Sequence, residues 1–220
     1  MKNIILSLIL LLGLGACSGE KEQQRHTKGV YMLVDTSGTY TKELKKAQQI
    51  INYILSQLDS GDSFVVASID TGSFSEKDII AKVTFDDRPS KANQQKRAFQ
   101  LAVDTYIKKV KSSPYTDITG GILQATEFLN EKNTASKTIL IFSDLEQDLK
   151  KGYIRDIPLS LNGYNVVALN VTKLRSDNID PRQYMDRLSE WREKVEKGGG
   201  EWQVLNDLER LDKLLKGKAQ

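Results

Sequence analysis

The sequence predicts an α/β fold: a doubly wound, mostly parallel sheet of about six strands with helices on both faces and one antiparallel edge strand. Short, nearly continuous apolar runs of strand length recur along the chain. Between most of them, apolar residues recur three or four positions apart, which is the spacing of one helix face. The connection from Ile69 to Ala81 shows no amphipathic helix and is short for a parallel crossover, which predicts an antiparallel strand after it.

The expected strands differ in how completely apolar they are. They cover residues 29–35, 63–69, 81–85, 138–142, 166–171 and 202–205. The first strand and residues 138–142 are almost wholly apolar, as is typical of strands buried on both faces. Residues 81–85 instead alternate apolar and polar side chains, which suits the edge of a sheet.

The expected helices follow from their apolar spacing and from signals at their ends. They cover residues 41–58, 99–110, 118–129, 181–195 and 208–215. Asp180 and Pro181 offer a cap and a first helical residue for the fourth of these helices. Three glycines at residues 198–200 end it.

The N-terminus has the layout of an export signal. A lysine at position 2 precedes an apolar stretch over residues 4–12 that is too short for a membrane-spanning helix. The next segment, Leu14-Gly15-Ala16-Cys17, resembles the lipobox of bacterial lipoproteins. The resemblance implies that residues 1–16 are removed and that Cys17, the only cysteine, is acylated. The same resemblance implies that Ser18 after this cysteine favours the outer membrane in an organism that has one, so the expected location is the cell envelope.

Residues 17–28 are polar and predict a flexible tether, so the expected folded domain covers residues 29–220. The net charge of +3 is too small to suggest a nucleic acid as partner. The single histidine, His26, lies in the tether. A Ser-His-Asp or Cys-His mechanism is therefore excluded from the domain, and no catalytic residue is expected.

Carboxylate and hydroxyl side chains gather where strands are expected to end. Asp35, Ser37 and Thr39 follow the first strand, Thr116 precedes the third helix, and Asp144 follows the strand at residues 138–142. In an α/β sheet the carboxyl ends of the strands carry the ligand sites. An all-oxygen set of this kind selects a hard ion such as Mg²⁺, with Mn²⁺ as a second choice, over Zn²⁺.

These residues resemble a von Willebrand factor type A (vWA) domain. That family opens its metal-ion-dependent adhesion site with Asp-x-Ser-x-Ser and completes it with a loop Thr and an Asp after the fourth strand. The matching residues occur in the same order: Asp35, Ser37, Thr39, Thr116 and Asp144. Two departures are Thr39 in place of the second Ser and Leu145 where the family often has Gly. The resemblance implies that an open position on Mg²⁺ accepts an acidic side chain from a protein partner.

The sequence leaves some readings open. Tyr40, Asp117 and Glu146 adjoin the predicted site and are expected to form a partner-binding rim. One alternative is a phosphotransferase that resembles haloacid dehalogenases, with Asp35 as nucleophile and with Asp144 and Asp148 binding the metal. Another is a scaffold subunit that keeps the fold and binds no metal. The oligomeric state is not set by any of these features.

Overall fold

A computed structural model describes residues 27–38, 40–70, 72, 75–206, 210, 211 and 213. Cys17, the signal segment and most of the tether lie outside the described residues, and so does most of the last expected helix. Within the described residues no helix has both the length and the apolar character needed to cross a membrane.

Six strands form one sheet in the order β3-β2-β1-β4-β5-β6. The strands are β1 (Lys28–Asp35), β2 (Ser63–Ile69), β3 (Ile79–Thr84), β4 (Ser136–Phe142), β5 (Tyr164–Leu169) and β6 (Glu201–Leu205). All neighbouring strands pair in parallel except β3, which lies antiparallel to β2 at one edge. The predicted fold class and its antiparallel edge are therefore confirmed.

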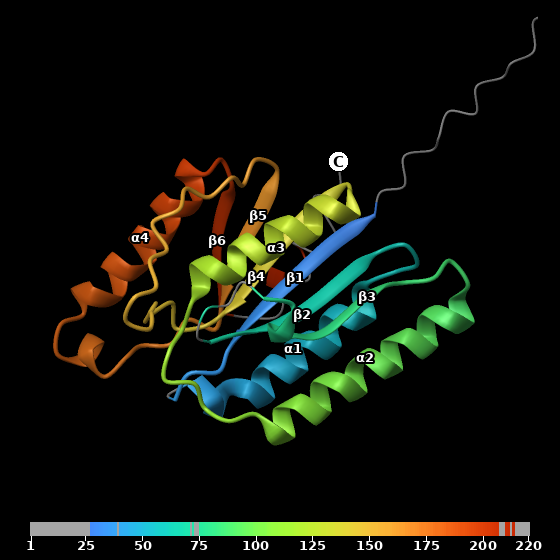
Figure 1. The fold of residues 1–220 in the computed structure, drawn as a ribbon, viewed down its shortest axis with the longest axis horizontal. Coiled ribbons are helices and arrows are strands. Elements are labelled where there is room, and N and C mark those ends of the chain that lie inside the picture. Colours follow the sequence, from blue (N-terminus) through green and yellow to red (C-terminus); the bar gives the residue numbers. More distant parts are fainter. Residues whose placement is uncertain are drawn as a thin grey trace, which may run out of the picture.

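Helices cover both faces of this sheet (Figure 1). They are α1 (Leu44–Gln57), α2 (Pro89–Lys109), α3 (Ile118–Lys132) and α4 (Arg182–Lys197), with short 3₁₀ turns η1 (Tyr40–Glu43), η2 (Glu76–Asp78) and η3 (Ser176–Asn178). Alternate residues of β1 point to opposite faces, so Met32 packs in the core with α1 and α2, whereas Leu33 packs with α3 and α4. Both central faces are apolar, which explains why the β1 run is nearly continuous.

The chain leaves β4 through a residue in a left-handed conformation. Leu145 has φ 68°, yet its side chain is only 1% exposed and packs in the core between the sheet, α3 and α4. Its amide N–H donates to Ser143 Oγ at 2.9 Å, and its carbonyl accepts the indole N–H of Trp191 at 2.9 Å. Backbone strain at this position is thus offset by burial and by two hydrogen bonds.

The strain at Leu145 predicts an unusual order of stability among its variants. Leu145→Ala should cost about 2–5 kcal/mol of unfolding free energy, because a buried side chain is lost. Leu145→Gly loses the same side chain but relaxes the positive φ, so it should be more stable than Leu145→Ala by about 1 kcal/mol. Urea unfolding of both variants measures the difference. An alanine variant as stable as the glycine variant would contradict the prediction.

Candidate functional site

The carboxyl ends of β1 and β4 bring two predicted site residues together. The two strands are parallel neighbours, and Val34 pairs with Phe142 at the last step of their register. Asp35 comes directly after Val34, and Asp144 comes two residues after Phe142. Ser143 bridges the ends of the two strands, because its hydroxyl donates to Asp35 Oδ2 at 2.6 Å.

Asp35 is fully buried beneath this edge. One carboxylate oxygen accepts the backbone N–H of Ser37 at 2.8 Å, and the other accepts the Ser143 hydroxyl. Burial raises the pKa of Asp35, while these donors and the hydroxyls of Ser37 and Thr116 act in the opposite direction. The carboxylate is therefore held in place with both oxygens engaged.

Asp144 lies beside it and is only 3% exposed. Burial raises its pKa to about 6; the backbone N–H of Glu146 works against this shift, and the nearby charge of Asp35 adds to it. The Glu146 N–H donates to Asp144 Oδ1 at 3.0 Å. The positive charge of Arg187 lowers this pKa only weakly, because its guanidinium is bound to Asp177.

A third segment, the connection between α2 and α3, closes over these strand ends. Thr116 is buried, and its backbone N–H and carbonyl exchange hydrogen bonds with Asp148 at 2.8 and 3.0 Å. Ser113 forms a parallel bridge with Ser37. These backbone contacts fix the Thr116 hydroxyl near the predicted ligands from β1 and β4.

A pocket of about 420 Å³ opens at this edge. It is lined by Ser37, Gly38, Ser112, Ser113, Pro114, Thr116, Asp144, Glu146 and Asp148. Three predicted metal residues line it, and Asp35 lies behind them. Among the described residues no three His, Cys, Asp or Glu side chains come together as a metal cage, so a cation here would depend on hydroxyl oxygens as well. Buried carboxylates beside hydroxyls, with little opposing positive charge, fit a hard divalent ion. Thr39 lies outside the described residues.

The expected rim needs correction at two of its three positions. Glu146 is exposed and lines the pocket. Tyr40 is 1% exposed: its ring packs against Phe142, and its hydroxyl donates to the carbonyl of Asn170 at 2.5 Å. Asp117 is fully buried because its carboxylate caps the Gly120 N–H of α3 and forms an ion pair with an arginine. Tyr40 and Asp117 are therefore buried beside the site and do not offer a surface to a partner.

Several residues that shape the site were not anticipated. Ser143 is one of them. Another is Gln147, whose side-chain oxygen accepts hydrogen bonds from the backbone N–H and the hydroxyl of Thr119 at the start of α3, at 2.9 and 2.8 Å. Arg155 pairs with Asp117 at 2.9 Å, and Arg187 donates to the Asp144 carbonyl at 2.8 Å. These contacts join residues 28 to 43 positions apart, and no local pattern in the sequence signals them.

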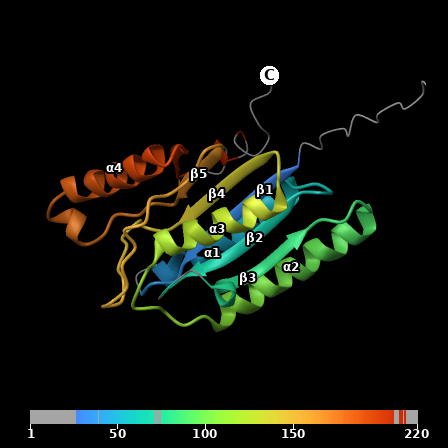
Figure 2. The same cartoon turned by 45° about the horizontal axis from the view of Figure 1, so that its top comes forward.

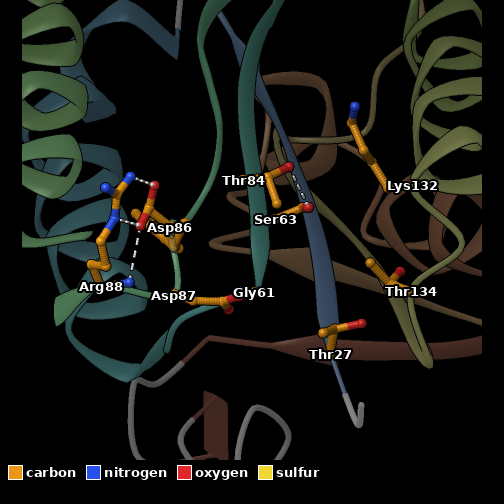
Figure 3. Close-up of a pocket in the computed structure, with 10 residues that line it drawn as sticks. Thr27, Gly61, Ser63, Thr84, Asp86, Asp87, Arg88, Lys132 and Thr134 are labelled. Atoms are coloured by element: carbon orange, nitrogen blue, oxygen red, sulfur yellow. Dashed lines mark hydrogen bonds and ion pairs between the residues drawn. The ribbon is translucent and has the colours of Figure 1, made fainter. Parts of the chain in front are cut away.

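A larger pocket of about 610 Å³ lies at the opposite edge of the sheet, beside Thr27 and Lys132 (Figure 3). Four of the polar side chains that line it bind one another. Arg88 pairs with Asp86, and Ser63 shares a hydrogen bond with Thr84 (Figure 3). Because no set of free ligand groups converges there, the smaller pocket is the better candidate site.

Comparisons with known proteins support the fold and leave the function open. No family model matches the chain, and no curated protein matches it either. A solved structure described as von Willebrand factor type A from Catenulispora acidiphila aligns with 86% of this chain at 14% identity and a TM-score of 0.50. The pilus adhesin SpaC from Lactobacillus rhamnosus GG aligns with 88% at 11% identity and a TM-score of 0.53. This chain spans only 41% and 30% of those two proteins. Together with the sheet order and the antiparallel edge, these matches show that the chain has the fold of a vWA domain.

Proposed function

We propose that this domain binds a protein partner through a Mg²⁺-dependent site at the carboxyl edge of its sheet. The observation that carries the proposal is the grouping of Asp35, Ser37, Thr116 and Asp144 from three separate segments around one pocket. The vWA fold supports it, and one protein of similar fold is described as a pilus adhesin. The alternative of a metal-free scaffold predicts that this pocket binds no cation.

Each residue has a distinct part in the proposed site. Ser37 and Thr116, with Thr39, provide hydroxyl oxygens as ligands. The Asp35 carboxylate holds Ser37 in place by accepting a hydrogen bond from the Ser37 backbone N–H. Asp144 contributes a second carboxylate from the end of β4. A divalent ion bound there supplies an electrophilic centre for a carboxylate oxygen of the partner. If the carboxylates mostly hold the ligands of the ion and do not bind it directly, the ion keeps more of its positive charge and attracts an incoming anion more strongly.

We further propose that the domain is not an enzyme. A nucleophilic aspartate needs an exposed oxygen, whereas Asp35 is fully buried and both of its oxygens accept hydrogen bonds. Thr116, which has no role in the phosphotransferase alternative, lines the pocket. A phosphatase assay and a search for an aspartyl-phosphate on Asp35 discriminate between the two functions.

Calorimetric titration of Mg²⁺ tests the metal site. The protein is the chain without residues 1–16 and with Cys17→Ser, so that no lipid is attached. Asp35→Ala and Asp144→Ala should each weaken binding by about 10–100-fold, the usual loss when a group that supports a metal ligand is removed. Asp148→Ala is the matched control, because its backbone rather than its side chain holds Thr116.

The outcomes of this titration separate the alternatives. Loss of Mg²⁺ affinity in Asp148→Ala as large as in Asp144→Ala would favour the phosphotransferase arrangement. Wild-type protein that binds neither Mg²⁺ nor Mn²⁺ would favour the metal-free scaffold. Circular dichroism of each variant establishes that the fold persists, as expected for residues outside the apolar core.

We also propose that acylated Cys17 anchors the protein in the bacterial cell envelope, with the outer membrane favoured. A single acyl chain binds a membrane only marginally, so more than one chain is needed for lasting attachment. Cys17→Ser should release the protein from the membrane fraction and change the processed N-terminus, measured by fractionation and mass spectrometry. A Cys17→Ser protein that stays in the membrane with unchanged processing would refute the anchor.

A further inference from the structure

Exposed apolar side chains concentrate near the proposed site. The described residues include six large apolar side chains that are exposed: Leu101, Tyr153, Ile154, Ile157, Ile179 and Met185. All but Leu101 belong to two segments, residues 150–157 between β4 and β5 (the loop tip) and residues 173–185 around η3 and the start of α4 (the helix tip). Ile154 is 78% exposed and Ile179 is 90% exposed. Single exposed apolar residues are ordinary, but such grouping marks interaction surfaces.

Each tip is fastened to the site by an arginine. In the loop tip, Arg155 Nε donates to Asp117 Oδ2, next to Thr116, and its guanidinium lies over the Tyr153 ring. Directly after the helix tip, Arg187 Nε donates to the Asp144 carbonyl. The backbone N–H of Asp117 bonds to the carbonyl of Asp70 just after β2, whereas Asp144 follows β4. The attachment points therefore lie on either side of β1 and of the pocket that β1 helps to line.

The two tips also carry a net positive charge around an acidic centre, even with their acids counted: Asp156 is exposed, and Asp177 and Asp180 pair with arginines. Lys150 and Lys151 in the loop tip and Arg175 in the helix tip are exposed, and none has an ion-pair partner in the part of the chain that the structure describes. Lys173 in the helix tip is exposed and lies over the Tyr184 ring. The pocket between the tips is lined by carboxylates, which repel an anion unless a cation is bound.

We propose that the two tips form the docking surface for the partner, and that the partner is an acidic and apolar protein segment. The inference rests on the proposed function: one carboxylate of the segment enters the pocket. Apolar side chains of the segment cover Ile154 and Ile179, and further acidic residues face the lysines. The charge pattern supports this choice, because the two tips are basic whereas the pocket between them is acidic. A segment with several acidic residues is therefore attracted to the tips along its whole length.

The place where β1 begins favours a protein over the anchoring membrane as the occupant. Lys28 begins β1, and the tips lie beyond the carboxyl end of that strand. The two regions therefore lie at opposite ends of the domain, and the start of β1 and the first turn of α4 are on opposite sides of it (Figures 1 and 2). The tips point away from the place where the proposed anchor joins the domain.

A displayed peptide library tests the docking surface. Each peptide has one fixed Asp flanked by random residues, and selection is made with Mg²⁺ on the chain that lacks residues 1–16 and carries Cys17→Ser. Selected peptides should be enriched in acidic and apolar residues beside the fixed Asp. Ile154→Ser, Ile179→Ser and the double variant Lys150→Glu/Lys151→Glu should each weaken their binding by about tenfold, or 1.4 kcal/mol. Leu101→Ser and Lys132→Glu, which alter exposed residues away from both tips, are the matched controls and should bind as wild type does.

The failures of the two proposals are distinguishable. Suppose that wild type binds Mg²⁺ and selects peptides, but the variants at Ile154, Ile179 and both lysines bind those peptides as tightly as wild type does. The proposed docking surface is then wrong, and the metal site stands. If no peptide is enriched although Mg²⁺ binds, the docking surface is also wrong. If no metal binds in calorimetry, the proposed function fails first. Sedimentation with phosphatidylglycerol vesicles that requires Ile154 and Ile179 would assign the tips to a lipid surface and overturn the inference. Self-association in ultracentrifugation that the same variants abolish would assign them to a second copy.

Discussion

Replacing Arg187 by Met is expected to lower the free energy of unfolding by about 2–4 kcal/mol, even though Arg187 lies outside the predicted metal set. Its guanidinium forms two hydrogen bonds with Asp177, whose side chain is fully buried, and a third with the carbonyl of Asp144. Removing the arginine leaves the Asp177 carboxylate buried without its cation. Breaking a fully buried ion pair costs more free energy than this. Here the Arg187 side chain is 12% exposed, so water can reach the ion pair and reduce the cost.

The pH dependence has a definite sign. Arg187 lowers the pKa of Asp177 below its ordinary value. The stabilisation is therefore fully present above the ordinary aspartate pKa and is lost as the pH falls through the lower, folded-state pKa. Wild type and Arg187→Met should differ most near neutral pH and converge in acid.

Two comparisons make this prediction testable by urea unfolding. Arg88→Met removes an arginine that pairs with Asp86 through a similar two-bonded geometry, but Arg88 is 64% exposed and its loss should leave the unfolding midpoint unchanged. The double variant Asp177→Asn/Arg187→Met removes both charges and should recover part of the lost stability. An Arg187→Met protein as stable as wild type would show that the pair contributes nothing.

The fold was predictable because the signals for it are local. Apolar runs and helical spacing mark most elements, and the short segment after Ile69 correctly predicts the antiparallel β3. The spacing misses the first half of α2, which begins at Pro89, ten residues before the expected start, because that half is mostly polar. The first strand starts at Lys28, one residue inside the expected tether: Lys28 pairs with Ser136 of β4, and its N–H donates to Asp62 Oδ1 at 2.7 Å. This hydrogen bond over 34 positions has no counterpart in the local pattern.

The candidate site was predictable only in part. Parallel strands end at a common edge, so Asp35 and Asp144 could be expected to meet there. The surroundings could not be foreseen, because they depend on distant partners. Asp117 is buried beside the guanidinium of Arg155, which neutralises its charge, and the buried Tyr40 hydroxyl donates a hydrogen bond to the Asn170 carbonyl. A polar residue that adjoins a site in sequence is expected at the surface unless such a partner is known. Leu145 gives no local signal of its positive φ either.

Asp144→Asn is expected to stabilise the metal-free protein at neutral pH while removing much of its Mg²⁺ affinity. The pKa of Asp144 is raised to about 6 in the folded protein from an ordinary value of 3.8. The fold therefore favours the protonated form, so this group's contribution to stability is greatest below its ordinary pKa. It is lost as the pH rises through that value to the folded-state pKa.

The size of the effect follows from the same shift. Above the folded-state pKa, the charged carboxylate costs the metal-free fold about 2–3 kcal/mol. Asparagine has nearly the same shape, and its Oδ1 still accepts the Glu146 N–H, so the variant removes this cost without leaving a cavity. Asp156→Asn, which alters an exposed carboxylate of the same loop, is the control and should change little.

Thermal unfolding with a chelator and with excess Mg²⁺ separates the two roles of this carboxylate. With the chelator near neutral pH, Asp144→Asn should melt at a higher temperature than wild type, and at about pH 4 the two should be nearly equal. With Mg²⁺ at about 100 times its Kd, binding stabilises wild type by about 2.7 kcal/mol, so the advantage of the variant should shrink or reverse. A variant less stable than wild type in chelator near neutral pH would show that Asp144 serves the fold. The expected result means that Asp144 is retained at a cost to the fold, which a bound cation offsets.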